Sequence, residues 1–150
     1  MIHHPAAGAL EEQWRPPGAR TPAERELWAH AVGCTRSLKR ALVQLALDVL
    51  TDAPDDRRRE SSRSVVRSAR ALDALAGDLR SAGLPLAGEL GAGLEQLCRA
   101  AAAAGSGRAA PAGSLSALRS AYRAVRAALR PCLPTEMVAE GLPVAIGGRA

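Results

Sequence analysis

The segment from Thr21 to Leu50 constrains the fold more than any other part of this 150-residue chain. It opens Thr-Pro-Ala-Glu, which offers a hydroxyl N-cap, a proline at the first helical position and a glutamate able to reach back to the cap. No further proline and only one glycine, Gly33, occur before Leu50. The pattern therefore predicts one helix of about eight turns.

This helix is apolar over most of its circumference. At about 100° per residue, one stripe contains Leu27, Ala31, Cys34, Leu38, Ala41, Leu42, Leu45 and Val49. The residues that widen the stripe are Trp28, Val32, Val43, Ala46 and Leu50. A polar edge is left for Glu26, His30, Arg36, Ser37, Arg40, Gln44 and Asp48. Such a helix needs at least two neighbours to cover it, which predicts the centre of a helical bundle.

Composition favours the same fold class. The hydrophobic content of 47% is carried by Ala, Leu and Val, with no Phe and one Tyr, which favours helix over sheet. The length suits one domain with a real core. We predict an all-α, up-and-down four-helix bundle over residues 21–131, with an extended N-terminal arm at 1–20 and a short C-terminal tail at 132–150.

Three further helices complete the predicted bundle. The second begins within residues 52–56, where Pro54 lies inside its first turn, and ends near Arg80. The third begins near Leu84 and extends into the alanine run at 100–104. A linker at 105–113 precedes the fourth, which Ser114 caps and Pro131 ends. Its alanines predict a smooth exposed face: Ala117, Ala121, Ala124 and Ala128.

Arginines recur at helical spacing on two of these helices. The second helix carries Arg59, Arg63, Arg67 and Arg70 within about 80° on the side opposite its apolar stripe. The fourth carries Arg119, Arg123, Arg126 and Arg130 immediately beside its apolar stripe. Rows of like charge do not stabilise a helix, so each is either a solvated face or an anion-binding ridge.

Residue patterns for catalysis or metal binding are weak, and we expect no enzyme activity, no metal and no cofactor. Arg25 and His30 match the Arg-x4-His spacing of a family of helical ribonucleases, but the pattern is short and lies in the first helix. His3 and His4 form an isolated pair. The three cysteines make no CxxC pair, which predicts buried, reduced thiols of a cytosolic protein at Cys34, Cys98 and Cys132. We expect a cytoplasmic protein of bacterial origin.

Net charge and the arginine rows favour a polyanion as partner. The net charge is +5, and Lys39 is the only lysine. No apolar run approaches the ~20 residues of a membrane span, so we expect no membrane partner. Guanidinium groups donate paired hydrogen bonds to phosphate, whereas the few aromatic residues disfavour base stacking. We therefore expect binding to the backbone of structured RNA, or, as the less favoured case, of duplex DNA, through the eight arginines.

A second function class stays open on the residues alone. The wide apolar arc of the first helix and the alanine face of the fourth are suited to packing against copies of the chain or another protein. The protein would then be an oligomerisation, scaffold or adaptor subunit with no nucleic-acid role, in which the arginines set orientation.

Residues 36–100 also resemble a known family. The order of Leu38–Leu50, Arg57–Arg59, the segment 67–80 and Leu90–Arg99 is similar to that in the accessory variability determinant proteins of diversity-generating retroelements. The resemblance implies a small basic four-helix bundle that forms a homo-oligomeric ring and binds RNA and a partner protein, the element's reverse transcriptase. The family's closing Gly-Gly-Trp and its helical aromatic residues are missing here, and an additional helix follows.

Overall fold

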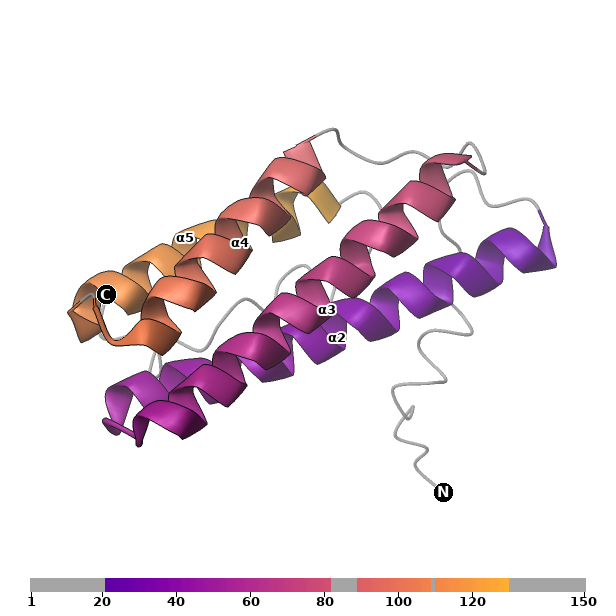
Figure 1. Ribbon diagram of the computed structural model, residues 1–150. Coiled ribbons are helices and arrows are strands. Elements are labelled where there is room, and N and C mark those ends of the chain that lie inside the picture. Colours follow the sequence, from indigo (N-terminus) through magenta and orange to yellow (C-terminus); the bar gives the residue numbers. More distant parts are fainter. Residues whose placement is uncertain (1–20, 82–88, 109, 130–150) are drawn as a thin grey trace, which may run out of the picture.

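The computed structural model describes residues 21–81, 89–108 and 110–129. These residues form four α-helices: α2 (Pro22–Leu50), α3 (Asp55–Ser81), α4 (Glu89–Ser106) and α5 (Pro111–Leu129). The predicted all-α, up-and-down bundle is confirmed (Figure 1). The predicted arm and tail, the start of the third helix and Arg130 lie outside the described residues.

Each helix packs chiefly against the helices next to it in the chain. The close pairs are α2 with α3, α3 with α4, and α4 with α5, whereas α2 meets α4 and α5 over smaller areas. Figure 1 shows the long helices α2 and α3 side by side, with α4 and α5 as the second pair. No helix in the described ranges has the length and apolar character needed to cross a membrane.

The core lies along most of the stripes that the sequence predicts, but Leu50, which was expected to widen the stripe of α2, is 46% exposed. On α2, Trp28, Leu38, Leu42 and Leu45 are fully buried, while Leu27, Cys34 and Ala41 are half-buried at the edge. The predicted stripe of α3 is buried throughout: Val65, Ala69, Leu72, Leu75, Ala76 and Leu79. Leu90, Leu94 and Leu97 of α4 and Leu115, Leu118 and Leu129 of α5 complete the core.

The turn between α2 and α3 differs from the prediction. Asp52 has a left-handed φ of 51°, and the amides of Asp52 and Ala53 donate to the carbonyls of Val49 (3.4 Å) and Asp48 (2.9 Å). These two bonds form a Schellman motif, so Asp52 belongs to the end of α2. The carbonyl of Pro54 accepts the Arg58 amide at 3.0 Å, which places Pro54 at the N-cap of α3 and not within the first turn.

The turn between α4 and α5 is shorter than predicted. The expected linker at 105–113 is wrong, because Gly105 and Ser106 extend α4 and α5 already begins at Pro111. Ser114 is not a cap: it is buried, and its amide donates to the Ala110 carbonyl at 2.9 Å. Proline favours the first helical position because it has no N–H to leave unpaired.

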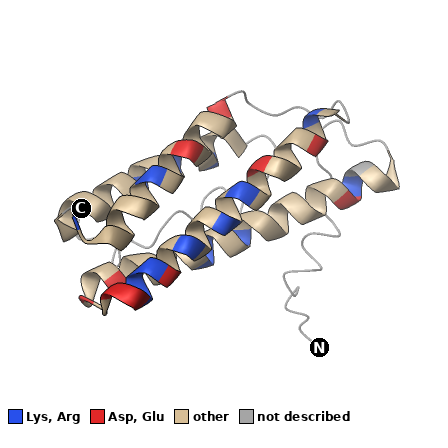
Figure 2. Cartoon of the chain, viewed as in Figure 1, with Lys and Arg blue, Asp and Glu red and all other residues tan. Residues whose placement is uncertain are grey.

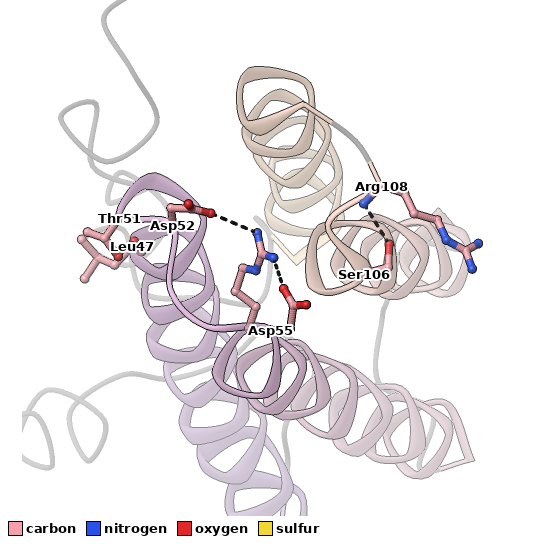
Figure 3. Close-up of polar contacts among 7 residues, drawn as sticks. Leu47, Thr51, Asp52, Asp55, Ser106 and Arg108 are labelled. Atoms are coloured by element: carbon pink, nitrogen blue, oxygen red, sulfur yellow. Dashed lines mark hydrogen bonds and ion pairs between the residues drawn. The ribbon is translucent and has the colours of Figure 1, made fainter.

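Arg58 lies at this end of the bundle, where it pairs with Asp52 and Asp55, the two aspartates labelled in Figure 3. Its guanidinium pairs with Asp55 and lies 3.7 Å from the carboxylate of Asp52, and its side chain is 17% exposed. A Cβ at Gly107 would lie 3.0 Å from Nη2 of Arg58, and Gly107 has a left-handed φ of 70°. Arg58 therefore packs against the backbone that ends α4, where the helix dipole favours a cation.

Helices α3 and α4 approach each other closely where Ser62 meets Gly105. A Cβ at Gly105 would lie 2.6 Å from the Cβ of Ser62, a separation that real Cβ atoms essentially never show. The Ser62 hydroxyl also donates to the Ala101 carbonyl of α4 at 2.8 Å. Glycine is therefore required at this contact for steric reasons.

We expect Gly105→Ala to lower the free energy of unfolding by about 1–3 kcal/mol, because the added methyl group forces α3 and α4 apart. The matched control is Gly77→Ala: Gly77 is an exposed residue of α3, and a Cβ added there would meet nothing within 4 Å. The control should raise stability by up to ~1 kcal/mol through helix propensity. Urea denaturation followed by circular dichroism measures both, and equal effects would contradict the close approach.

Candidate nucleic-acid interface

Two adjacent serines of α3 bond to different neighbouring helices. Ser61 donates its hydroxyl proton to Oδ2 of Asp48 on α2, and Ser62 donates to the Ala101 carbonyl on α4. Neighbouring helical residues point about 100° apart, so the two bonds together fix the rotation of α3 about its axis. That rotation determines which face of α3 is turned outward.

On α2, Asp48 accepts the hydrogen bond from Ser61. Its position differs from the prediction. The sequence placed it on the polar edge of α2, but it is 2% exposed. Gln44 Nε2 donates to its Oδ1 at 2.9 Å, and Arg57 Nε lies 3.4 Å from the same oxygen. A buried carboxylate needs such partners because it has lost its water. The available signal was its position beside the apolar stripe of α2, together with two hydroxyl residues within the stripe of α3.

The predicted arginines of α3 all lie on the outward face. Arg59, Arg63, Arg67 and Arg70 are exposed, and we call these four residues the α3 arginine row. Figure 2 shows Lys and Arg recurring along this helix. The row extends about 17 Å along the helix axis, at the rise of 1.5 Å per residue.

One carboxylate of the described residues pairs with the row, and the exposed Asp56 lies on the same face one turn before Arg59. Glu60 Oε1 accepts from Arg67 at 3.1 Å, and Glu60 Oε2 lies 3.8 Å from Nη1 of Arg63. All three side chains are more than half exposed, so these pairs are screened by solvent and contribute little. No carboxylate of the described residues lies within ion-pair distance of Arg59 or Arg70.

Arg70 borders a shallow groove between α3 and α4. The groove has a volume of about 340 Å³, and its polar lining includes Asp73, Glu95 and Cys98. Burial raises the pKa of the Cys98 thiol; Arg70 opposes the rise, and Asp73 and Glu95 add to it. The two carboxylates reduce the positive potential at this end of the row.

The arginines of α5 are placed differently. Arg119 and Arg126 are half-buried, and Arg123 is exposed. Long side chains beside an apolar stripe bury their stems in this way while the guanidinium groups stay near solvent. Helix α5 packs mainly on α4, whereas α3 lies between α2 and α4, so the bundle does not merge the two predicted rows into one ridge.

The predicted alanine face of α5 and the predicted burial of the cysteines also differ from the structure. Of the four alanines expected to form a smooth face on α5, Ala121 and Ala128 are buried and only Ala117 and Ala124 are exposed. Cys34 and Cys98 are free thiols, but they are half-buried and not fully buried as predicted. His3, His4 and Cys132 lie outside the described residues.

The ribonuclease-like spacing does not form a joint site on α2. Arg25 and His30 are both exposed, and five residues of helix separate their directions by about 140°. Within the described ranges, no three His, Cys, Asp or Glu side chains gather as metal ligands.

Comparison of the chain with protein-family models, curated proteins and solved structures finds no match.

We expect Asp48→Ala to lower the free energy of unfolding by about 1–3 kcal/mol, because Ser61 loses its acceptor inside the protein. Asp78→Ala is the matched control: Asp78 is an exposed carboxylate on α3, and its loss should change stability by less than about 0.5 kcal/mol. Urea denaturation measures both. Similar losses for the two variants would show that the buried carboxylate does not hold α2 and α3 together.

Burial also raises the pKa of the Cys34 thiol. A raised pKa lowers the fraction of reactive thiolate at neutral pH, so iodoacetamide should alkylate Cys34 and Cys98 more slowly in the folded protein than in urea. The alkylation rate of the folded protein should still rise with pH at pH values where the alkylation rate of the unfolded chain has already become constant. Peptide mass spectrometry separates the cysteines, and equal folded and unfolded rates would contradict this expectation.

Proposed function

We propose that this protein is a non-catalytic, basic helical accessory subunit that binds the phosphate backbone of structured RNA through the α3 arginine row and also binds a partner protein. The observation that carries the proposal is the exposure of all four arginines of the row on one outward face. The fold does not use these side chains for packing, so their charge is available to a polyanion.

The geometry of the row suits phosphates. Arg63 and Arg67 are separated by one helical turn, about 6 Å along the axis, so successive guanidinium groups can reach successive phosphates of one strand. The weak pairs with Glu60 are easily exchanged for phosphate contacts, because a guanidinium binds phosphate through paired hydrogen bonds. Arg123 on α5, with Arg119 and Arg126 beside it, provides a second and weaker contact surface.

Recognition through base stacking is disfavoured. Trp28 is 0% exposed and Tyr122 is 4% exposed, so these two aromatic residues belong to the core. Binding through the backbone alone selects for the shape of a duplex or hairpin and not for its bases. Structured RNA is the proposed ligand, and duplex DNA is the alternative that the same experiment tests.

The resemblance to accessory variability determinant proteins supports a finer proposal. The partner protein would be a reverse transcriptase, and the subunit would act as a homo-oligomer. A reverse-transcriptase gene beside the gene for this chain, and co-purification of the two products, would support that partner. The competing function is an adaptor without any nucleic-acid role, and two exposed leucines on α2, Leu47 and Leu50, favour it.

The test is fluorescence anisotropy with a labelled RNA hairpin and a DNA duplex of matched sequence. For about four phosphate contacts, affinity should fall roughly 100-fold between ~50 and ~200 mM salt. Replacing the whole α3 arginine row by Gln should remove most of the binding and flatten the salt dependence. Glu60→Gln should tighten binding a few-fold, because it removes the only carboxylate paired with the row among the described residues.

The matched control replaces Arg80 and Arg99, which are exposed arginines outside the row. This pair should leave affinity within about twofold of the unaltered protein, because neither residue belongs to the proposed interface. Absence of binding at ~50 mM salt, or equal losses for the row and the control, would refute the RNA proposal and leave the adaptor function.

A further inference from the structure

The α3 arginine row ends at a groove whose charges do not suit a phosphate. Arg70, the last residue of the row, borders the groove between α3 and α4, and Asp73 follows one turn later on the same helix. Glu95 lines the groove from α4. Carboxylates repel a phosphate group, so the phosphate contacts of the row end at Arg70. This end of the row therefore suits a group that carries hydrogen-bond donors.

The charged side chains of the groove act on one point and are only partly paired. Arg70 lowers the pKa of the Cys98 thiol, whereas Asp73 and Glu95 raise it, so all three lie near that thiol. Glu95 is paired with Arg99 at 2.6 Å. Arg70 and Asp73 have no hydrogen bond or ion pair in the described part of the chain, although opposite charges at this helical spacing can pair. A guanidinium and a carboxylate are thus both open to a ligand.

The groove also has apolar surface and room for a small ring system. Its volume of about 340 Å³ falls within the range of small-ligand pockets, roughly 300–1,000 Å³. Ala69 and Leu94, which are both buried, provide the apolar part of its lining. A Cβ built at Gly91 would lie 3.9 Å from Oδ1 of Asp73, so a larger side chain at Gly91 would fill the space beside this carboxylate.

Guanine is the RNA base that matches this combination. Its N7 and O6 atoms are adjacent acceptors, and arginine is their commonest specific partner. Its N1–H and N2–H groups are adjacent donors on the Watson–Crick edge, from which an ionised carboxylate can accept both hydrogen bonds. No other RNA base has two adjacent donors beside two adjacent acceptors. In a duplex the partner base occupies the Watson–Crick edge, so the guanine must be unpaired.

We propose that the groove between α3 and α4 binds one unpaired guanine, in a bulge or loop beside the duplex that the α3 arginine row contacts. Arg70 donates to O6 and N7, Asp73 accepts from N1–H and N2–H, and the ring lies against the apolar lining. This inference rests on the RNA-binding part of the proposed function and adds one base-selective contact to it.

The experiment measures fluorescence anisotropy with the full chain and labelled RNA hairpins that differ in a single bulged base. The hairpin with a bulged guanine should bind about tenfold more tightly than the same hairpin with a bulged uracil. Two analogues each remove one contact: inosine lacks the N2 amino group that faces Asp73, and 7-deazaguanine lacks the N7 acceptor that faces Arg70. Either analogue should weaken binding a few-fold.

Asp73→Asn separates the two possible roles of this carboxylate by the sign of its effect. As a guanine acceptor, Asp73 is needed, so the variant should bind the guanine-bulged hairpin about fivefold more weakly and should no longer distinguish inosine from guanine. A carboxylate that only repels phosphates would instead give tighter binding when it is removed. Asp78→Asn, at an exposed carboxylate of α3 outside the groove, is the matched control and should change affinity less than about twofold.

Two further variants locate the base. Arg70→Gln should remove the discrimination between guanine and 7-deazaguanine. Gly91→Leu fills the groove without changing any charge, so it should abolish the preference for guanine and leave the salt dependence of binding as it was. Circular dichroism verifies that each variant folds.

The results distinguish failure of this inference from failure of the proposed function. Equal binding of guanine- and uracil-bulged hairpins, or tighter binding by Asp73→Asn, would overturn the guanine site and leave backbone binding intact. If no hairpin binds at ~50 mM salt, the RNA function itself fails and the guanine site falls with it.

Discussion

The orientation of α3 depends on two hydrogen bonds made by adjacent serines. Ser61 donates to the buried Asp48 of α2, and Ser62 donates to the Ala101 carbonyl of α4. Apolar burial is non-directional, so it sets the rotation of a helix less sharply than a directed hydrogen bond does. Rotating α3 would break the bond to the buried carboxylate, and an unsatisfied polar group inside a protein costs about 1–3 kcal/mol. The serines therefore restrict α3 to one rotation.

That rotation connects the fold to the proposed surfaces. It turns the α3 arginine row toward solvent and places Ser62 against Gly105, where no side chain fits. One turn earlier along α3, Arg58 pairs with Asp52 and Asp55 and lies close to the backbone of Gly107. The arginines of α3 thus have two roles: Arg58 is bonded into the structure, while the row stays outside it.

The proposed RNA interface lies on a face that packing leaves exposed. The α3 arginine row presents charge without apolar surface, which suits a phosphate backbone.

The sequence by itself determined where α2 begins and ends, the four-helix architecture, most of the buried face of each helix and the position of the α3 arginines opposite their apolar stripe. These features follow from local chemistry: Thr21 and Pro22 start a helix, and apolar periodicity defines its inner side. The exposure of the α3 arginine row was decided by the tertiary structure. Only the tertiary structure decided the fate of residues at the edges of the stripes. Asp48 is buried against Ser61 of the neighbouring helix. Ser114 lies inside α5, because that helix begins at Pro111 and not after Ser114. Half of the α5 alanines pack inward. Whether a residue at the edge of an apolar stripe is exposed to solvent depends on how closely the neighbouring helix approaches. The sequence of one helix does not specify that distance.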